Sequence, residues 1–544
     1  MDGLEFPNIS RRPTRNAVVL LLLMLFLVIS ILSSPRISTT LDEPLHYHYG
    51  LLILDGNSNR IDDSSMPASA LNALPDHISA LLPVGLLRSV LERFFVARLV
   101  TILFSMMVAL LVFRWSQALY GIVPAIFATV LYVLDPNVIA HSQLVTTDVF
   151  LAGMVAWSSY LLWKFANSRS RPVGLMCAVA LGLSQLTKYT ALALYPLGLL
   201  ALIVHDWPSM RDSCRALGIR GLGRYAGRLG LYSAVVLISS TLIINLGFLF
   251  NRTLTTVKDY QFRSEAFRTL QASFPALDNI RVPVPYPYLQ GLDWILETNR
   301  TADRFGNIYL LGHTSKPQGF PGYYFVASLL KMPIATQIIV LAALIAHLRR
   351  KVGSVRFFKD EIFLLLPVAF FTIYLNFFFN AQTGIRYYLV VFPLLYVFAG
   401  SLFVDWSGFG PKAKAVGVLL LVYLAASVLS YFPYYIPYFN ELVLNKTQTY
   451  RFLSDSNLDW GQATDDLARY LAEHKDAIYD PAQVEAGRLV VGGSDLVGVL
   501  VSPERYAWLR DNFEPVGTVA YCYFIYQVSP QDIAELCART GDCK

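Results

Sequence analysis

The sequence has little charge and few cysteines for its length. Of its 544 residues, 15% are charged and 55% are hydrophobic, whereas a soluble globular domain has about 25% charged residues. Five cysteines are too few for a disulfide framework. Only the tail, which carries Cys522, Cys537 and Cys543, could hold one bridge.

Motifs for common cofactors are also missing. The sequence has no P-loop, no Gly-x-Gly-x-x-Gly run, no Cys-x-x-Cys pair and no histidines at zinc-ligand spacing. We therefore expect no nucleotide cofactor and no structural zinc. The net charge of +6 comes from basic residues scattered in short loops, which also predicts no nucleic-acid partner.

What the chain has instead is a series of long apolar blocks. Most are about 15 to 22 residues long, the length that crosses a ~30 Å hydrocarbon core. We therefore predict a polytopic α-helical membrane protein with about eleven transmembrane helices, whose first partner is the lipid bilayer. The predicted spans are 17–34, 99–113, 119–134, 149–163, 172–186, 189–204, 229–250, 333–348, 361–378, 387–404 and 415–432.

Basic residues in the short loops predict the orientation of these spans. With a cytoplasmic N-terminus, the short outside loops carry only Lys188 and Arg386. The outside segments are then 35–98, 251–332 and 433–544. The 19 basic residues inside are Arg11, Arg12, Arg15, Arg114, Lys164, Arg169, Arg171, Arg211, Arg215, Arg220, Arg224, Arg228, Arg349, Arg350, Lys351, Arg356, Lys359, Lys412 and Lys414.

Two of the outside segments have internal patterns. Apolar residues at helical spacing over 71–95, interrupted by Pro83, predict two helices that lie in the membrane interface. After the last span, we predict an amphipathic helix over 465–475 and strands over 488–491 and 516–528. The predicted domains are a membrane module, 1–432, with outer loops 35–98 and 251–332, and a small extracytoplasmic α/β domain, 433–544.

Carboxylates near the outer ends of the spans are candidate site residues. Asp42 and Glu43 follow the first span, beside His46, where burial would raise a carboxylate's pKa towards that of a useful base. Asp148 begins the fourth span, and His141 lies in the same loop. Taken alone, the acidic pair is better explained as a solvated interfacial anchor, and Asp148 as a helix N-cap.

Cations near the outer ends form a second candidate group. Lys188 and Arg386 break the charge asymmetry, and a cation held there is what a phosphate group needs. Snorkelling to lipid phosphates would explain either cation equally well. Lys331 precedes the eighth span, after an aromatic cluster that includes Tyr323 and is either an interfacial girdle or a platform for a sugar ring.

In their order along the chain, these elements resemble a known family. The pattern is similar to the GT-C glycosyltransferases of the protein mannosyltransferase and aminoarabinose transferase type, and a closer similarity is to bacterial phospholipid-carrier-dependent glycosyltransferases. The resemblance covers nearly the whole chain. It rests on Asp42-Glu43 after the first span, Arg98-Leu99, Leu119-Tyr120-Gly121, the run 140–148, Gly384-Ile385-Arg386-Tyr387, Asn440-Glu441 and the run 455–462.

The resemblance implies an inverting transfer of a hexose or pentose from a polyprenyl-phosphate donor to a hydroxyl of a protein, lipid or glycan. It implies Asp42 as the catalytic base, and Glu43 and Asp148 as orienting groups that could share a divalent cation. Location in a bacterial inner or cytoplasmic membrane is also implied. The implied donor-phosphate ligands are Arg386, Lys188, Arg98 and Lys331, and the acceptor or sugar ligands are His46, His141, Tyr323 and Tyr387.

One departure and two other functions stay open. Met66-Pro67-Ala68 stands where eukaryotic protein mannosyltransferases carry His-Pro-Pro, which puts protein O-mannosylation in doubt. A transporter or lipid flippase is the main alternative, although transporters place ionisable groups near mid-membrane and usually contain paired repeats. An adhesion or assembly protein would leave Asp42 and Asp148 without a role.

Overall fold

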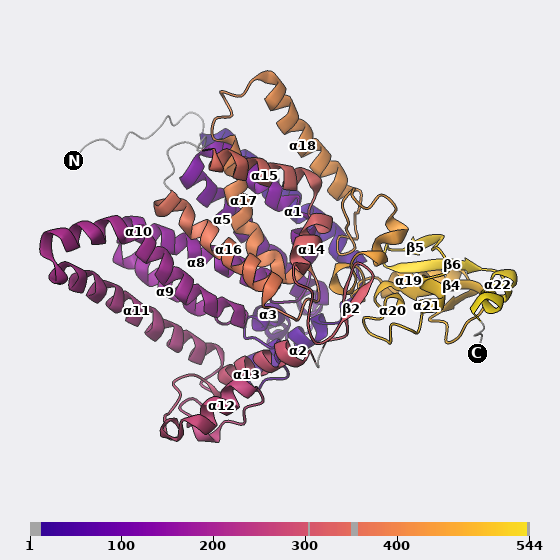
Figure 1. The fold of residues 1–544 in the computed structure, drawn as a ribbon, viewed down its shortest axis with the longest axis horizontal. Helices are drawn as coiled ribbons and strands as arrows, with labels where there is room; N and C mark the ends of the chain where they lie inside the picture. The colour runs from indigo at the N-terminus through magenta and orange to yellow at the C-terminus, as the bar shows by residue number, and fades with distance from the viewer. Residues whose placement is uncertain (1–11, 303–304, 350–356, 541–544) are drawn as a thin grey trace.

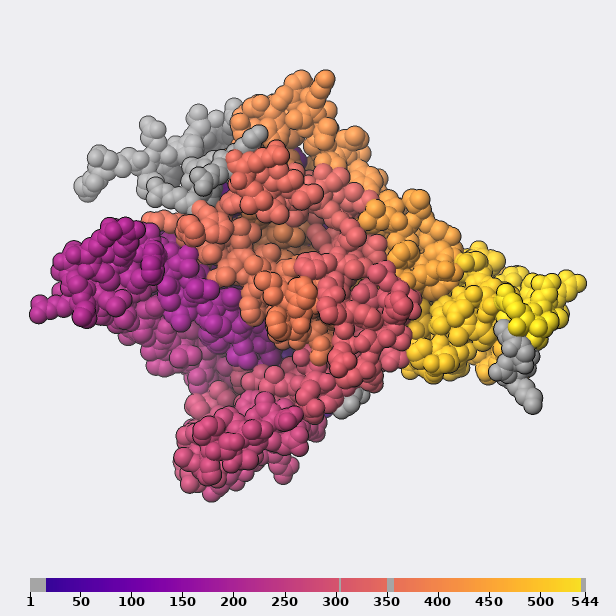
Figure 2. Space-filling model, viewed as in Figure 1, coloured from indigo at the N-terminus to yellow at the C-terminus, as the bar shows by residue number. Residues whose placement is uncertain are grey.

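The chain is mostly helical in a computed structural model, which describes residues 12–302, 305–349 and 357–540. Figure 1 shows one bundle of helices from which a long helical hairpin and the C-terminal segment extend in opposite directions. The space-filling view in Figure 2 shows both as projections from a central mass. Of the residues named above, Arg11, Arg350, Lys351, Arg356 and Cys543 lie outside the described ranges.

Each predicted apolar span falls on a helix, as predicted. Within the described residues, eight helices are long and apolar enough to cross a membrane, or up to ten if each of two bent pairs is one span. α9 has 14 residues, about 21 Å at 1.5 Å per residue, which is short of a ~30 Å core. The helices on these spans are α1 (Arg12–Ser33), α5 (Phe94–Tyr120), α6 (Ile122–Val133), α8 (Asp148–Ser168), α9 (Arg171–Ser184), α10 (Leu194–Leu217), α11 (Ile219–Gly247), α15 (Ile334–Leu348), α16 (Ile362–Phe377), α17 (Phe392–Gly400) and α18 (Pro411–Leu429).

The centre of the bundle is formed around α17 and the 3-10 helix η7 (Ile385–Val391) before it. Their apolar stretch is 83% buried, compared with 22% for α11 and 22% for α18. A helix that is apolar on all sides is stable only when other elements cover it. Because α17 is enclosed by its neighbours, the residues of η7 at its start are held firmly in place.

The first outer segment contains one helix that was not predicted. α2 begins directly after Asp42, with Pro44 in its first turn, where a proline is tolerated because no intrahelical N–H bond is lost. The two helices predicted on either side of Pro83 are present, and their placement in a membrane interface stays a prediction. The helices of this segment are α2 (Glu43–Leu54), α3 (Ser69–Ser79) and α4 (Leu86–Leu91).

The other short elements connect the spans. Between α6 and α8 lies α7, bent by 61° from α6, and α14 precedes α15 at an angle of 118°. β1 and β2 form an antiparallel hairpin in which Tyr309 pairs with Thr314. These elements are α7 (Pro136–Ser142), α12 (Glu265–Ser273), α13 (Tyr286–Thr301), β1 (Ile308–Leu310), β2 (His313–Ser315) and α14 (Tyr323–Lys331).

The C-terminal segment folds as the predicted small α/β unit, with one correction. Its sheet has the order β3-β4-β6-β5, and only the β3–β4 pair is parallel. The single strand predicted over 516–528 is wrong, because the chain turns at Ala520 and Tyr521, with left-handed φ of 48° and 63°. Neither residue is a usual turn former, so composition gave no sign of the break. The elements are α19 (Thr464–Glu473), β3 (Ala477–Tyr479), β4 (Gly487–Gly492), α20 (Gly493–Leu496), α21 (Ala507–Arg510), β5 (Gly517–Val519), β6 (Tyr523–Val528) and α22 (Pro530–Thr540).

Candidate active site

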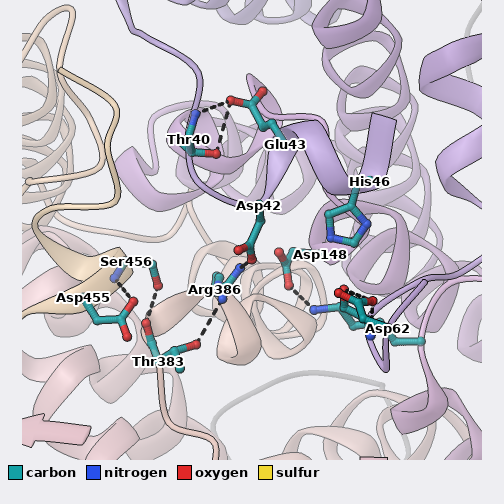
Figure 3. A network of polar contacts seen from close by, with 12 residues as sticks. Thr40, Asp42, Glu43, His46, Asp62, Asp148, Thr383, Arg386, Asp455 and Ser456 are labelled. Atoms are coloured by element: carbon teal, nitrogen blue, oxygen red, sulfur yellow. Dashed lines mark hydrogen bonds and ion pairs between the residues drawn. The ribbon is translucent and has the colours of Figure 1, made fainter. Parts of the chain in front are cut away.

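Two carboxylates and two cations that are distant in the sequence form one cluster. Arg386 Nη1 donates to Asp42 at 2.6 Å, and Lys188 Nζ donates to Asp148 at 2.5 Å. In Figure 3, the Asp42 and Asp148 carboxylates lie close to each other, and the Arg386 guanidinium lies beside that of Asp42. The structure therefore brings together four residues that the sequence suggested separately.

Each of these side chains stands where a secondary-structure element begins. Asp42 precedes α2, and Asp148 is the first residue of α8, where a negative charge is favoured by the helix dipole. Lys188 directly precedes the 3-10 helix η3 (Tyr189–Ala193), and Arg386 is the second residue of η7. The cluster thus lies at the shared end of α8, η3 and η7.

Burial increases from Asp42 inward. The Asp42 side chain is 36% exposed, whereas those of Lys188, Arg386 and Asp148 are 17%, 7% and 2% exposed. The cluster is therefore most exposed at Asp42. Among the residues that the structure describes, the buried Nε of Arg386 has no hydrogen-bond partner. An unpaired buried donor is costly, so an oxygen atom bound at this N–H would stabilise the site.

The ionisation of Asp42 is set by its two neighbours. Burial raises the pKa of Asp42, but the Arg386 guanidinium lowers it, and the net pKa lies below its usual value. Burial lowers the pKa of His46 despite the nearby Asp42 charge. Its Nδ1 lies 3.3 Å from Ser69 Oγ. At neutral pH we therefore expect an ionised Asp42 beside a neutral His46.

Glu43 and Arg98 form a separate, fully satisfied ion pair. Arg98 donates to both Glu43 oxygens, at 2.8 and 2.7 Å, and its other N–H groups donate to three backbone carbonyls. A guanidinium has five N–H donors, and all five are used. Glu43 is 0% exposed and also accepts from the backbone N–H of Val145. Contrary to expectation, neither side chain has a free group for acceptor or phosphate.

Lys331 is also directed away from the cluster. Its side chain is 0% exposed, and Nζ donates to the backbone carbonyls of Ile436 and Asn457, each at 2.6 Å. Lys331, which was predicted to bind phosphate, thus lies inside the protein, where its hydrogen bonds connect α14 to the segment after α18.

The predicted sugar-binding residues have different positions. Tyr387 is half-buried and belongs to the cluster, with Lys188 Nζ 4.5 Å from its ring centroid. Tyr323 is 1% exposed and its hydroxyl accepts from Asn457 at 2.8 Å. His141 is 1% exposed and its ring lies 6.1 Å from that of Trp460. Tyr323 and His141 are therefore buried inside the protein.

A turn after the last span completes the site, and sequence reasoning gave it no role. Ser456 Oγ donates to the carbonyl of Thr383, and Asn457 Oδ1 accepts from the N–H of Ile385 at 2.9 Å. A side chain at Gly384 would lie 2.2 Å from Ser456 Oγ. The turn thus holds the backbone that carries Arg386. The polar run 455–462 was the available signal, used above only for the resemblance.

The same turn brings an aromatic ring and a third carboxylate to Arg386. The guanidinium carbon lies 4.2 Å from the Trp460 ring centroid, a favourable cation–π distance. Asp455 has a left-handed φ of 57°. Burial raises the pKa of Asp455 to about 7, although Arg386 opposes the rise. Asp455 is therefore partly protonated at neutral pH.

The first and second outer segments meet beside Lys188. Arg60 Nη1 donates to the Tyr189 hydroxyl at 3.0 Å, which in turn donates to the carbonyl of Tyr288 at 2.6 Å. Arg60 also donates to the carbonyl of Asp63 at 2.7 Å. These bonds fix Tyr189, the residue next to Lys188, between the outer segments 35–98 and 251–332.

The donor set gives little support for a metal ion. Among the described residues, no group of three or more His, Cys, Asp or Glu side chains could hold one. A divalent cation at Asp148 or Glu43 stays a prediction, and both carboxylates already have cationic partners.

Part of the chain matches a known family. Residues 87–219 match the family model described as dolichyl-phosphate-mannose-protein mannosyltransferase. This segment contains Arg98, Asp148 and Lys188. The match confirms the resemblance to protein mannosyltransferases over that segment and supports glycosyl transfer from a lipid-linked donor. A search of curated proteins gave no significant match.

Several solved structures are similar to the chain. ArnT from Cupriavidus metallidurans bound to undecaprenyl phosphate is 13% identical, with a TM-score of 0.45, over 93% of this chain and 97% of that chain. The archaeal oligosaccharyltransferase AglB from Archaeoglobus fulgidus, in complex with an inhibitory peptide and a dolichol-phosphate, is 13% identical, with a TM-score of 0.48, over 85% of this chain and 60% of that chain.

Proposed function

We propose that this protein transfers a sugar from a polyprenyl-phosphate donor to an acceptor hydroxyl at the extracytoplasmic face of the membrane, with inversion at the anomeric carbon. The observation that carries the proposal is the ion pair of Asp42 and Arg386, with Asp42 at the more exposed edge of a cluster of paired carboxylates and cations. The proposal covers a hexose or pentose and an acceptor that is a protein, a lipid or a glycan.

Asp42 and Arg386 have opposite roles in the proposed reaction. The acceptor oxygen forms a bond to the anomeric carbon while the bond from that carbon to the phosphate oxygen breaks. Asp42 takes the proton of the acceptor hydroxyl. The polyprenyl phosphate leaves with increased negative charge, which Arg386 and Lys188 stabilise more in the transition state than in the ground state.

The ion pair couples donor binding to the strength of the base. Without substrate, Arg386 keeps the pKa of Asp42 low, so the carboxylate is ionised but weakly basic. A donor phosphate competes for the guanidinium through its Nη groups and its unpaired Nε. As the pair with Arg386 loosens, burial raises the pKa of Asp42. The base therefore becomes stronger when a donor is present.

Asp148 and Lys188 form the more buried ion pair of the cluster. Asp148 holds Lys188 next to Tyr387, so the ammonium is preorganised for the phosphate. Preorganised charges need little rearrangement during the reaction. We assign both residues a positioning and charge-stabilising role, and base catalysis to Asp42 alone.

Two observations support the extracytoplasmic placement of the pocket. The short loops on the pocket side carry two basic residues, compared with 19 in the opposite segments. In the C-terminal segment, Cys537 is in a disulfide and Cys522 is free. Disulfides form in oxidising compartments such as the bacterial periplasm.

The test is mass spectrometry of glycans and lipids from cells with and without the gene, followed by an assay of the purified protein with the donor so identified. We expect the wild type and Asp55→Asn, an exposed acid at the end of α2, to release polyprenyl phosphate and form product. Asp42→Asn is expected to do neither. Movement of intact donor across the bilayer without release would indicate a flippase and contradict the proposal.

A further inference from the structure

A large cavity lies at the end of the bundle opposite the active site. Its volume is about 1070 Å³, and residues of α8, α9, α10 and α11 line it. α8 has Asp148 at its first residue and contributes Phe165 and Ala166 near its last. Its 21 residues span about 30 Å at 1.5 Å per residue. The cavity is therefore a separate site, lined by the half of the α10–α11 hairpin that contains its turn; Figure 1 shows this hairpin projecting from the bundle.

The cavity is strongly basic. Among the described residues that line it, Asp206 is the only acid, and it is paired with Arg169 and with His205. Within the described ranges, the other four cations have no ion pair. His205 also lines the cavity, and its buried Nε2 has no partner among the described residues. The five lining cations are Arg169, Arg171, Arg224, Arg228 and Lys359.

The positive charge continues into an apolar surface. Arg224, Arg228, Leu231 and Val235 all line the cavity, and their spacing of four, three and four residues places them on one face of α11. Leu231 is 69% exposed and Val235 is 36% exposed. The arginines come first, and the apolar residues follow towards the middle of the membrane span. A ligand that fits this order has an anionic head and an apolar tail.

We propose that this cavity binds an anionic phospholipid of the leaflet opposite the active site. Its phosphate lies among Arg224, Arg228 and Lys359, where guanidinium groups can bind it in a bidentate manner. One acyl chain follows Leu231 and Val235 along α11. A free anion would use the cations but not the apolar stripe, and an uncharged lipid would leave the cations unpaired.

The hairpin itself provides a matched control. Arg211 and Arg215 lie on α10, are exposed and do not line the cavity. They carry the same charge at the same end of the bundle. If the arginines serve only the orientation of the chain in the membrane, the two pairs are equivalent. If the cavity is a binding site, only Arg224 and Arg228 matter for lipid affinity.

The experiment measures lipid binding to the purified full-length protein by native mass spectrometry. Wild type is titrated with phosphatidylglycerol, phosphatidylcholine, a polyprenyl phosphate and inorganic phosphate. We expect preference for phosphatidylglycerol over phosphatidylcholine, and a loss of about tenfold or more in its affinity for Arg224→Ala/Arg228→Ala. Arg211→Ala/Arg215→Ala is expected to bind as wild type does. Melting temperatures without added lipid identify misfolded variants.

A second variant tests the apolar part of the site. Leu231→Ser/Val235→Ser keeps the cations and is expected to weaken phosphatidylglycerol binding as well. Equal losses in the two arginine pairs, or equal affinity for phosphatidylcholine, would overturn the proposal. Competition by inorganic phosphate at the same concentration as the lipid would also overturn it, because it would indicate a site for free anions. Stronger binding of the polyprenyl phosphate than of phosphatidylglycerol would overturn it too, because it would indicate a second donor site.

Discussion

The Asp42 carboxylate and the Arg386 guanidinium are 344 residues apart in the chain and 2.6 Å apart in the structure. Asp42 is the more exposed partner and Arg386 the more buried. In the proposed reaction, an acceptor that approaches from the exposed side of the cluster therefore meets the carboxylate first. The cation behind it is held by Trp460 and by the turn that carries Ser456.

Replacing Asp42 removes the proposed base. We expect Asp42→Asn to lower kcat by about 10²–10⁴-fold, the usual range for a general base, with donor affinity within a fewfold of wild type. Turnover and donor binding are measured separately on the same preparation. Asp55→Asn, at the other end of α2, is the matched control and is expected to be active. Near-normal turnover of Asp42→Asn would exclude Asp42 as the base.

Replacing Arg386 changes both donor affinity and pH dependence. Arg386→Ala removes the cation that lowers the pKa of Asp42, while burial still raises it. The pKa of Asp42 therefore increases, and the acidic limb of the kcat/KM profile moves to higher pH. We also expect a KM for the donor at least about tenfold higher, from loss of charged hydrogen bonds. An unshifted acidic limb would show that Asp42 is not the titrating group.

Lys188 and Asp148 depend on each other for stability. Lys188→Met leaves Asp148, 2% exposed, as an unpaired buried charge, which costs about 3–5 kcal/mol of unfolding free energy. Asp148→Asn/Lys188→Met removes both charges, and we expect most of the stability to return. Thermal melts in detergent measure the effect. Activity should stay low in both variants, so a double variant as active as wild type would contradict the assigned role.

Arg98 and Arg386 are expected to respond differently to lysine. Arg98→Lys loses at least two of the five hydrogen bonds around Glu43, because an ammonium has three donors. We expect lower stability and an unchanged donor KM for the folded fraction. Arg386→Lys should keep the stability closer to wild type and raise the donor KM. If Arg98→Lys raised the donor KM without lowering stability, Arg98 would be assigned to the phosphate site after all.

Asp455 gives the donor affinity a dependence on pH near neutrality. The pKa of Asp455 is about 7, so the carboxyl is neutral below that pH and ionised above it. Its charge then competes with the donor phosphate for Arg386, and the donor KM of wild type should rise as pH increases through 7. In Asp455→Asn the KM should stay flat over the same range. A parallel rise in both proteins would assign the titration to another group.

The sequence was sufficient to predict the apolar spans and to single out the four charged residues of the cluster, Asp42, Asp148, Lys188 and Arg386. Apolar length and loop charge depend on local composition, so they identified the helices and drew attention to Lys188 and Arg386. The roles of Glu43 and Arg98 could not be read in this way. Their pairing across 55 residues uses backbone carbonyls whose positions exist only in the folded chain.

The same limit explains the missed helix and turn. The apolar and aromatic residues of α2 do not gather on one face of the helix, so the sequence showed only a weak helical periodicity there. The 455–460 turn contains Asp, Ser and Asn, which are typical of any loop. Its importance comes from the approach to Gly384, a contact between segments that no local pattern encodes.

The buried side-chain nitrogen of Lys331 also determines where the chain can be truncated. Its two acceptors belong to Ile436 and Asn457, both beyond the predicted boundary at 432. A truncated chain that stopped after α18 would keep the buried Lys331 Nζ and lose both of its acceptors, at a cost of about 1–3 kcal/mol for each unsatisfied donor. The last hundred or so residues are therefore no detachable module, and a minimal catalytic fragment must retain at least the stretch through Trp460.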